Sequence, residues 1–239
     1  MKKLTISDRA GPENDIKEFF KRWPGFYSFM YDFFSPIYFG GLSPRSFLKK
    51  YPNTGLCLNL GSGTRRIDAQ VLNVDIANYD GVDVVADITK LPYSDGGIAR
   101  IICDQTLEHL HNPEQAIMEI RRVLAPGGYG YISTPFMYPF HASPSDYQRW
   151  THVGLKHLLK DFEIIEIGVR SGPFSTFTVH LCYLFASLLS FGNERLYWLI
   201  VYSMGIPLFP VKCLDILGNK LPFAINMSSV PYVVIQKQK

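Results

Sequence analysis

The sequence predicts an α/β fold in which a doubly wound, mostly parallel sheet of seven strands has helices on both faces. Three observations support this fold class. Short β-branched runs recur between residues 56 and 169, helix-forming segments separate the later runs, and a final run lies at residues 232–235. Because most of these runs are continuously apolar, they are typical of strands buried on both faces of a parallel sheet.

The limits of each element can be expected from local residue patterns. We expect the seven strands at residues 56–60, 71–75, 82–87, 98–103, 130–134, 162–169 and 232–235. Asn112 and Pro113 are suited to begin a helix, and Pro126-Gly127-Gly128 is suited to end it before the fifth strand. Thr151 can cap a further helix ahead of the sixth strand.

The chain is expected to have three regions. Residues 1–50 are rich in aromatic side chains and are expected to form an N-terminal helical cap, either a packing helix or a lid over the substrate. Residues 51–170 together with 230–239 are expected to form the sheet domain. Residues 171–229 are mostly apolar and are expected to form a helical insertion before the last strand.

The composition disfavours several classes of protein. The chain has 239 residues, 47% of them hydrophobic, so it can bury a full α/β core. A net charge of +3 with dispersed basic residues disfavours a nucleic-acid partner. The four cysteines form no CxxC pair, so we expect neither a disulfide framework nor a metal site. Residues 1–22 lack the apolar run of a secretory signal, and a cytoplasmic location is expected.

A glycine-rich turn follows the first expected strand. Gly61 and Gly63 can adopt positive φ angles and let a ligand approach the backbone on either side of Ser62. Asp75 ends the second strand, where an acid can accept hydrogen bonds from both hydroxyls of a ribose. Asp87 ends the third strand, where it can reach the exocyclic amine of an adenine.

The other candidate residues lie at the same edge of the expected sheet. Ile88 can pack on the adenine ring, and Asp104 and Gln105 follow the fourth strand. Ligands of open α/β sheets bind at the carboxyl ends of the strands. Any single acid could be an ordinary strand-end or capping residue, so the prediction depends on their joint arrangement. The expected cofactor-binding residues are Asn59, Gly61, Ser62, Gly63, Asp75, Ile76, Asp87, Ile88, Asp104 and Gln105.

A dinucleotide site, as in an NAD-dependent oxidoreductase, is the main alternative. Its fingerprint G-x-G-x-x-G needs a third glycine, which would fall at Arg66. Asp75 also comes sooner than the usual spacing of about 20 residues. Residues 64–70 leave room for at most a short helix, whereas a pyrophosphate binds at a helix N-terminus. A nucleoside cofactor without a phosphate, such as S-adenosylmethionine, does not need that helix.

Residues 55–170 resemble the S-adenosylmethionine-dependent methyltransferases of the ubiquinone-biosynthesis-like group, the type 11 domain. The resemblance implies a class I methyltransferase with a Rossmann-like fold and S-adenosylmethionine as its cofactor. Residues 135–141 and 146–151 are similar to members from surface-polysaccharide biosynthesis, and the expected acceptor is a small molecule, a glycan or a lipid-linked precursor. Five motifs carry the resemblance: residues 58–63 (LNLGSG), 73–76 (NVDI), 86–93 (ADITKLPY), 104–110 (DQTLEHL) and 122–128 (RVLAPGG).

One position departs from the pattern of this family. Most members begin the first motif with an acid, where this chain has Asn59. An amide can still hydrogen-bond the amino end of the cofactor, but it lacks the charge attraction to the ammonium, so a weaker affinity is expected. The departure also leaves open a non-catalytic partner subunit that keeps the fold.

His141 and Asp146 are the candidate catalytic residues. Methyl transfer is expected to be an in-line displacement, in which a hydroxyl acceptor needs a general base and a neutral amine does not. Histidine titrates near neutral pH, and Asp146 could orient His141 or act alone. In the alternative interpretation, His141 belongs to a surface loop and Asp146 forms a structural pair with Arg149.

The apolar insertion has two stretches without charge, residues 171–193 and 196–211. Three interpretations are open: a helical lid or dimer surface, a hairpin that dips into one leaflet to reach a lipid-linked acceptor, and a hairpin that spans a membrane twice. Pro173 in the first stretch and Gly205 and Pro207 in the second make poor spans. Peripheral contact with the inner face of a membrane is therefore an expectation for residues 171–217.

Overall fold

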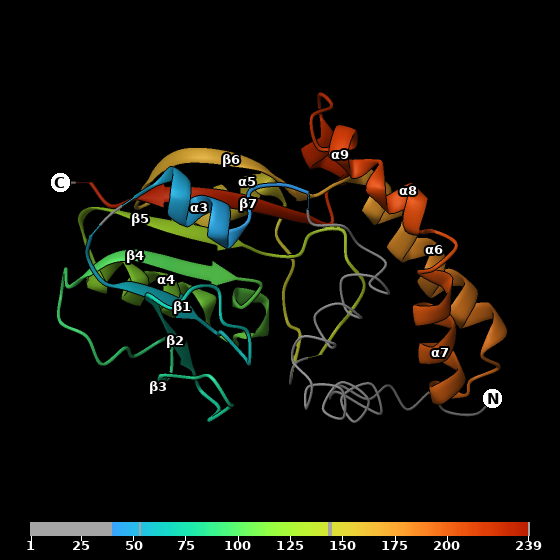
Figure 1. Ribbon diagram of the computed structural model, residues 1–239, viewed down its shortest axis with the longest axis horizontal. Helices are drawn as coiled ribbons and strands as arrows, with labels where there is room; N and C mark the ends of the chain where they lie inside the picture. Colours follow the sequence, from blue (N-terminus) through green and yellow to red (C-terminus); the bar gives the residue numbers. More distant parts are fainter. Residues whose placement is uncertain (1–39, 53, 143–144, 239) are drawn as a thin grey trace. The chain divides into compact units, whose positions relative to one another are not determined.

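Two compact units make up the described part of the chain (Figure 1). The computed structural model describes residues 40–52, 54–142 and 145–238. The sheet unit comprises Gly41–Phe136, Gln148–Arg170 and Val230–Lys239, and the helical unit includes Met137–Tyr147 and Ser171–Ser229. Of the expected N-terminal cap, residues 1–39 lie outside the described residues, and Pro44–Lys50 form helix α3.

Seven strands form the sheet in the order β3-β2-β1-β4-β5-β7-β6. The strands from β3 to β5 pair in parallel, and β7 pairs with β5 in the antiparallel direction. The expected seven-stranded, mostly parallel sheet is therefore confirmed. Its strands are β1 (Cys57–Leu60), β2 (Val71–Asp75), β3 (Val84–Val85), β4 (Ile98–Asp104), β5 (Leu124–Ser133), β6 (Glu163–Ser171) and β7 (Val230–Gln236).

Helices cover both faces of this sheet because alternate strand residues point to opposite sides. On β4, Ile101 joins the larger core cluster, which includes Ile120 of α4 and Leu155 of α5. The next residue, Ile102, joins the smaller cluster with Phe47 of α3. Besides α3, the sheet unit has the helices η1 (Leu107–His109), α4 (Pro113–Val123) and α5 (His152–Leu158).

The ends of β1, β4, β6 and β7 differ from expectation by one or two residues. Two larger differences have a physical cause. β3 is shorter than residues 82–87 because it is an edge strand with one neighbour, and its Val85 side chain is exposed. The expectation that Pro126-Gly127-Gly128 ends α4 is wrong. The helix ends at Val123, because Leu124 is already extended. The proline and glycines lie inside β5, where the register with β4 shifts.

Glu166 of β6 is an acceptor that joins α3 to the sheet. Lys50 Nζ and Tyr51 Oη donate to Glu166 Oε2 over 2.8 and 2.7 Å, and Tyr232 Oη donates to Oε1 over 2.8 Å. Partial burial by itself would raise the pKa of Glu166. The three hydrogen bonds outweigh burial and hold the pKa below its ordinary value.

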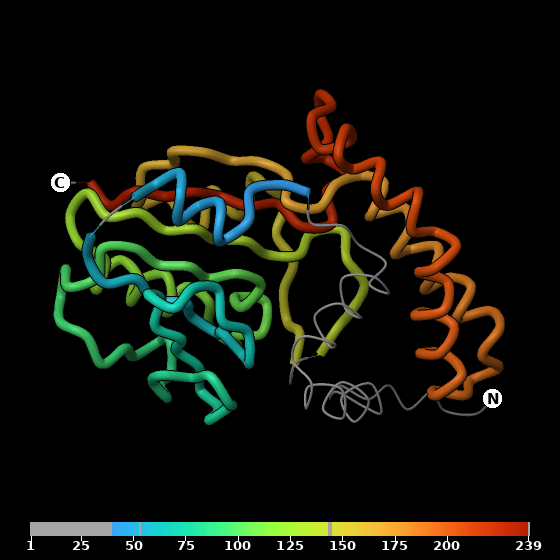
Figure 2. Tube along the Cα trace, in the orientation of Figure 1, coloured from blue at the N-terminus to red at the C-terminus, as the bar shows by residue number. Residues whose placement is uncertain are grey.

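Helices fill the interval between β6 and β7, where a helical insertion was expected. Figure 2 shows the chain turning after α6 and running back along it as α7. The Asp215 carboxylate accepts hydrogen bonds from the backbone N–H groups of Gly172, Phe174 and Ser175, and so caps the N-terminus of α6. The unit contains α6 (Pro173–Leu189), α7 (Glu194–Met204), α8 (Phe209–Cys213), α9 (Asp215–Gly218) and η2 (Ala224–Met227).

A helix that crosses a membrane needs about 20 mostly apolar residues. In the described ranges, no helix is by itself both long enough and apolar enough to cross a bilayer. α6 is apolar but has only 17 residues. Taken together, α7 and the stretch Phe209–Gly218 reach the length and hydropathy of one span, with a bend of 56° between them.

Replacing Glu166 by glutamine is expected to lower the free energy of unfolding by about 1–3 kcal/mol at neutral pH, because three donors lose a charged acceptor. A carboxylate whose pKa is lowered by folding stabilises the protein above its unfolded-state pKa. That contribution disappears as the pH falls through the folded-state pKa. The difference between wild type and Glu166→Gln should therefore be full at neutral pH and shrink below about pH 4. Urea unfolding over a pH series measures it.

Glu163→Gln is the matched control. Glu163 begins the same strand and its side chain is exposed. Its effect should stay within about 0.5 kcal/mol. Equal losses in the two variants, or a Glu166→Gln effect that does not change with pH, would contradict the role given to these hydrogen bonds.

Candidate active site

The glycine turn after β1 is fixed by close packing. Gly61 has a φ of 65°, and its N–H donates to the carbonyl of Val74 over 2.8 Å. A Cβ at Gly61 would lie 2.2 Å from Thr106 Cγ2, so no larger residue fits. Thr106 Oγ1 in turn donates to the carbonyl of Leu60 over 3.1 Å. The turn is thereby tied to β2 on one side and to the end of β4 on the other.

Asp75 connects this turn to the end of β2. Its Oδ2 accepts a hydrogen bond from the N–H of Gly63 over 2.8 Å, and its Oδ1 accepts one from the N–H of Ala77 over 3.0 Å. The side chain is buried, while that of the next residue, Ile76, is exposed. Because each carboxylate oxygen can accept more than one hydrogen bond, both oxygens keep capacity for a ligand hydroxyl.

Beneath the turn, two buried amides form a polar layer between β1 and β2. Asn59 Nδ2 donates to Asn73 Oδ1 over 3.1 Å and to the carbonyl of Arg65 over 3.5 Å. Asn73 Nδ2 donates to the carbonyls of Arg65 and Gly81 over 3.3 and 2.9 Å. The N–H groups of Asn59 are therefore engaged inside the protein, and its side-chain oxygen is the group that it can offer to a ligand.

Arg66 occupies the place where a dinucleotide site needs its third glycine. Its Nη2 donates to Asp83 Oδ1 over 2.7 Å and to the carbonyl of Gly81 over 3.2 Å. The hydrogen bond from the backbone N–H of Asn73, followed by that from Arg66, holds the pKa of Asp83 below its ordinary value. Residues 61–70 are all described and contain no helix, so no helix N-terminus is available there for a pyrophosphate.

A small hollow of about 70 Å³ opens at this edge of the sheet. It is where half of the predicted cofactor residues meet, since the carboxyl ends of β1 and β4 are adjacent. Gly63 lies beside open space, because a Cβ built there would meet no atom within 4 Å. The residues lining the hollow are Asn59, Gly61, Ser62, Arg65, Ile67, Asp104 and Gln105.

A buried arginine supports Asp104. Arg170 Nη2 lies 3.2 Å from Asp104 Oδ2, and Ser133 Oγ donates to Asp104 Oδ1. Arg170 also donates from Nη1 to Tyr131 Oη over 3.3 Å. Sequence reasoning missed Arg170, although a charged residue at the end of an apolar strand is a usable signal. Gln105 follows with a φ of 55°, and its N–H donates to the carbonyl of Ser133 over 2.9 Å.

Asp87 and Ile88 lie after β3, outside the group that lines the hollow. Asp87 Oδ1 accepts hydrogen bonds from Thr89 N and Thr89 Oγ1 over 2.8 and 2.7 Å, which leaves Oδ2 as the oxygen for another donor. Ile88 is buried in the larger core cluster and so anchors the loop after β3 to the core. Contact of either residue with an adenine stays a prediction.

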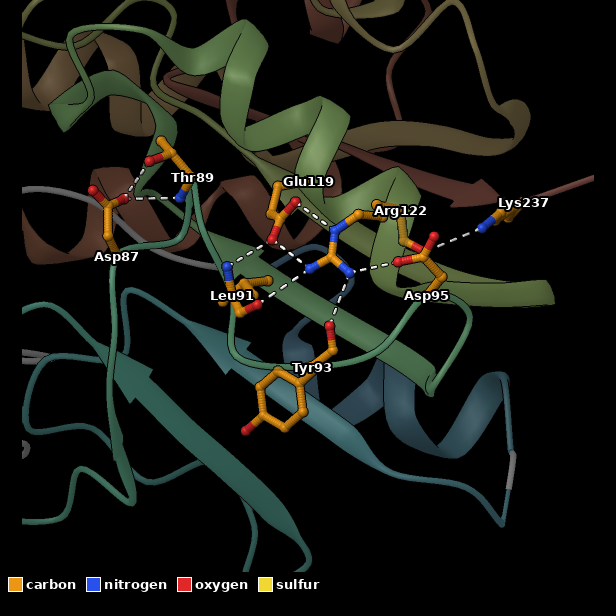
Figure 3. Close-up of polar contacts among 8 residues, drawn as sticks. All are labelled: Asp87, Thr89, Leu91, Tyr93, Asp95, Glu119, Arg122 and Lys237. Atoms are coloured by element: carbon orange, nitrogen blue, oxygen red, sulfur yellow. Dashed lines mark hydrogen bonds and ion pairs between the residues drawn. The ribbon is translucent and has the colours of Figure 1, made fainter.

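The loop that follows Ile88 is held by one arginine of α4 (Figure 3). Arg122 donates to the carbonyls of Leu91 and Tyr93 over 3.2 and 2.9 Å, and pairs with Asp95 over 2.6 Å. Glu119 accepts from the N–H of Leu91 over 2.7 Å and pairs with Arg122 over 2.6 Å. This i, i+3 pair was not predicted as part of the site, because its targets are backbone atoms of a distant loop.

The two predicted catalytic residues lie in the helical unit. His141 Nδ1 is 3.4 Å from Asp146 Oδ2, and the same oxygen accepts a hydrogen bond from the His141 backbone N–H over 2.9 Å. The Asp146 side chain is buried, whereas that of His141 is partly exposed. Tyr138 packs edge-on against the imidazole at 5.0 Å. The geometry therefore brings His141 and Asp146 together as a pair.

Comparison with known proteins identifies the segment that holds the hollow. Residues 55–132 match the family model described as "Methyltransferase domain". Residues 55–132 are a methyltransferase domain. The expected resemblance to this family is confirmed, and the domain includes the glycine turn, Asp75 and the residues that follow β4.

Solved structures similar to this chain have the fold of methyltransferases. A Thermotoga maritima S-adenosylmethionine-dependent methyltransferase, described as a possible histamine N-methyltransferase, is 15% identical with a TM-score of 0.55, over 92% of this chain and 99% of that one. Phosphoethanolamine N-methyltransferase 2 of Haemonchus contortus, in complex with S-adenosylmethionine, is 15% identical with a TM-score of 0.52. The match covers 99% of this chain and 61% of that one. At these identities the likeness shows the fold.

A curated relative matches a shorter segment. An uncharacterised 37.1 kDa protein in transposon TN4556 of Streptomyces fradiae is 46% identical over 59 residues, which are 24% of this chain. The matched segment spans 17% of the length of that relative. This match therefore concerns part of the methyltransferase chain and says nothing of an activity.

Replacing Asn59 by aspartate, the acid usual at this position, is expected to destabilise the methyltransferase domain by about 1–3 kcal/mol, because it removes both buried donors and faces Asn73 Oδ1 with a second acceptor. Thermal unfolding without cofactor measures the loss. Asn78→Asp, on the exposed loop after β2, is the control and should change stability little. An Asn59→Asp variant as stable as wild type would contradict the inference that the Asn59 side chain stabilises the domain through the buried amide layer.

Proposed function

We propose that this chain is an S-adenosylmethionine-dependent methyltransferase acting on a small-molecule, glycan or lipid-linked acceptor. One observation carries the proposal. Within the methyltransferase domain, the glycine turn, Asn59 and Asp104 line one hollow at the carboxyl ends of β1 and β4. Open α/β sheets bind their ligands at this edge. The structures of similar fold include an enzyme in complex with S-adenosylmethionine, which supports the choice of cofactor.

The residues of this edge fit the cofactor in chemistry. Open space beside Gly63 gives room for a ligand against the backbone. The Asp75 carboxylate would accept hydrogen bonds from the two ribose hydroxyls, and the Asn59 oxygen one from the ammonium of the amino-acid end. Asp87 would accept from the adenine amine. When bound, S-adenosylmethionine supplies a methyl group made electrophilic by its sulfonium.

The work left to the protein is orientation and, for a hydroxyl acceptor, removal of a proton. We assign the proton to His141, because the Pro139 carbonyl 3.3 Å and the Asp146 carboxylate 3.4 Å from Nδ1 can hold the ring in one orientation. Nε2 would then receive the proton of the acceptor. For an amine acceptor this step is unnecessary, and the pair would orient the substrate instead.

S-adenosylmethionine is expected to bind saturably, and Asp75→Ala is expected to weaken binding at least about 100-fold, the equivalent of two hydrogen bonds to a charged acceptor. Calorimetric titration measures the affinity. Asp80→Ala is the matched control, because Asp80 lies five residues further along in an exposed loop. Asp75→Asn, which keeps an acceptor for the Gly63 N–H, separates loss of the turn from loss of the cofactor contact.

The same titration with NAD tests the dinucleotide alternative. No heat with S-adenosylmethionine would refute the proposed cofactor, and saturable binding of NAD in its place would point to an oxidoreductase. Saturable S-adenosylmethionine binding without methylation of any acceptor would support the non-catalytic subunit. Labelled cofactor and an envelope glycolipid fraction are the first acceptor screen, followed by soluble glycans and small amines.

His141→Ala is expected to lower kcat about 100-fold or more with a hydroxyl acceptor, as for loss of a general base, without weakening cofactor binding. Asp146→Asn should lower kcat less, because it keeps a polar partner for the ring. His157→Ala is the control, since His157 is exposed on α5. A His141→Ala enzyme with unchanged kcat would remove His141 from the mechanism and leave the cofactor site unaffected.

A further inference from the structure

Charged residues are few between β6 and β7, and two of them are buried. Residues 171–229 contain five charged residues, Glu194, Arg195, Lys212, Asp215 and Lys220. Lys212 and Asp215 are buried. Asp215 is used to cap α6, and Lys212 Nζ lies over the ring of Phe209 at 4.9 Å. Over this stretch of 59 residues, only Glu194, Arg195 and Lys220 keep their charge on the surface.

An apolar stripe runs along the outer face of α6. Phe177, Leu184 and Leu188 are 55%, 54% and 62% exposed. Their spacings of seven and four residues place them on one side of a helix. The opposite side carries Cys182 and Ala186, which are buried against α7. The stripe therefore faces away from α7 and does not contribute to the core between the two helices.

The stripe ends at an aromatic tip. Phe191 lies in the turn between α6 and α7 and is 89% exposed. It has a φ of 49°, and Gly192 follows with a φ of 79°, so the turn projects a large apolar side chain at the end of the hairpin. Further exposed apolar side chains continue over α7 and the segment after it: Leu199, Ile206, Leu214, Ile216, Leu217, Leu221 and Phe223.

The shape and the low charge of this surface favour a lipid layer over a protein partner. A protein partner needs a complementary rigid surface, and its interface usually has a polar, charged rim. Here the most exposed apolar side chain is at a projecting tip, and charge is scarce over the whole stretch. A fluid lipid layer adapts to a projecting shape and requires no rim. Exposed apolar patches of this extent on a water-soluble surface mark interaction sites.

We propose that the α6–α7 hairpin inserts into one leaflet of a lipid bilayer, with the α6 stripe and Phe191 in the acyl-headgroup boundary. The depth is shallow, because no helix of the described chain qualifies as a span on its own and the one qualifying pair is bent by 56°. Glu194 and Arg195, which begin α7 close to Phe191, would stay in the headgroup layer. Since charges are few, apolar insertion provides the affinity, and anionic lipid adds little.

Vesicle flotation with the full chain tests this. Two vesicle types are used, phosphatidylcholine alone and phosphatidylcholine with phosphatidylglycerol, each at low and high salt. The variant combines Leu184→Glu, Leu188→Glu and Phe191→Asn, the last because asparagine tolerates positive φ. The control combines Met118→Glu and Val153→Glu, which change two equally exposed apolar residues of the sheet unit, 63% each. Thermal unfolding checks that every variant is folded.

Wild type and control are expected to float with both vesicle types at both salt concentrations, and the hairpin variant to bind at least about tenfold more weakly. Failure of wild type to float would overturn the proposal, as would equal flotation of the hairpin variant. Flotation that needs anionic lipid and disappears in salt would assign the contact to surface charge. If the hairpin variant instead converts a dimer to a monomer in light scattering, the stripe joins two copies. Binding of S-adenosylmethionine should be the same in all variants.

Discussion

The close packing of Gly61 against Thr106 is the constraint on which the cofactor edge depends. A side chain at residue 61 would overlap Thr106, whose hydroxyl holds the last carbonyl of β1. The chain therefore turns at Gly61, and its N–H reaches back to Val74 on β2. The turn in this position brings the N–H of Gly63, a residue beside open space, within hydrogen-bond distance of the Asp75 carboxylate.

Polar side chains hold the loops at this edge of the sheet, where residues 61–70 form no helix. Asn59 and Asn73 fasten the segment after the turn through the carbonyl of Arg65. Arg170 supports Asp104, and Arg122 holds the loop after β3. Each of these groups is paired, so burial costs little and the loops become rigid. Rigid loops suit a reaction in which the protein mainly positions two partners.

The two units use buried charge in different ways. In the sheet unit, the buried Arg170 pairs with Asp104, which lines the hollow. In residues 171–229, Asp215 and Lys212 are buried, and exposed apolar side chains outnumber the exposed charges of Glu194, Arg195 and Lys220. The proposed cofactor site and the proposed lipid-binding hairpin on one chain would suit an acceptor that is itself held at a membrane. This combination favours the lipid-linked class among the three proposed acceptors.

The sequence by itself determined the parallel sheet, the start of α4, the glycine turn and the methyltransferase family, because strand periodicity, Asn112 capping and short motifs are local properties of the chain. Only the tertiary structure decided that β3 shrinks to two residues, that Pro126-Gly127-Gly128 lies inside β5, and that Arg170 meets Asp104 across 66 residues. It also decided that Ile88 is buried and Phe191 exposed. Pairing partners, edge position and burial depend on what packs nearby in space, and a linear pattern does not contain that.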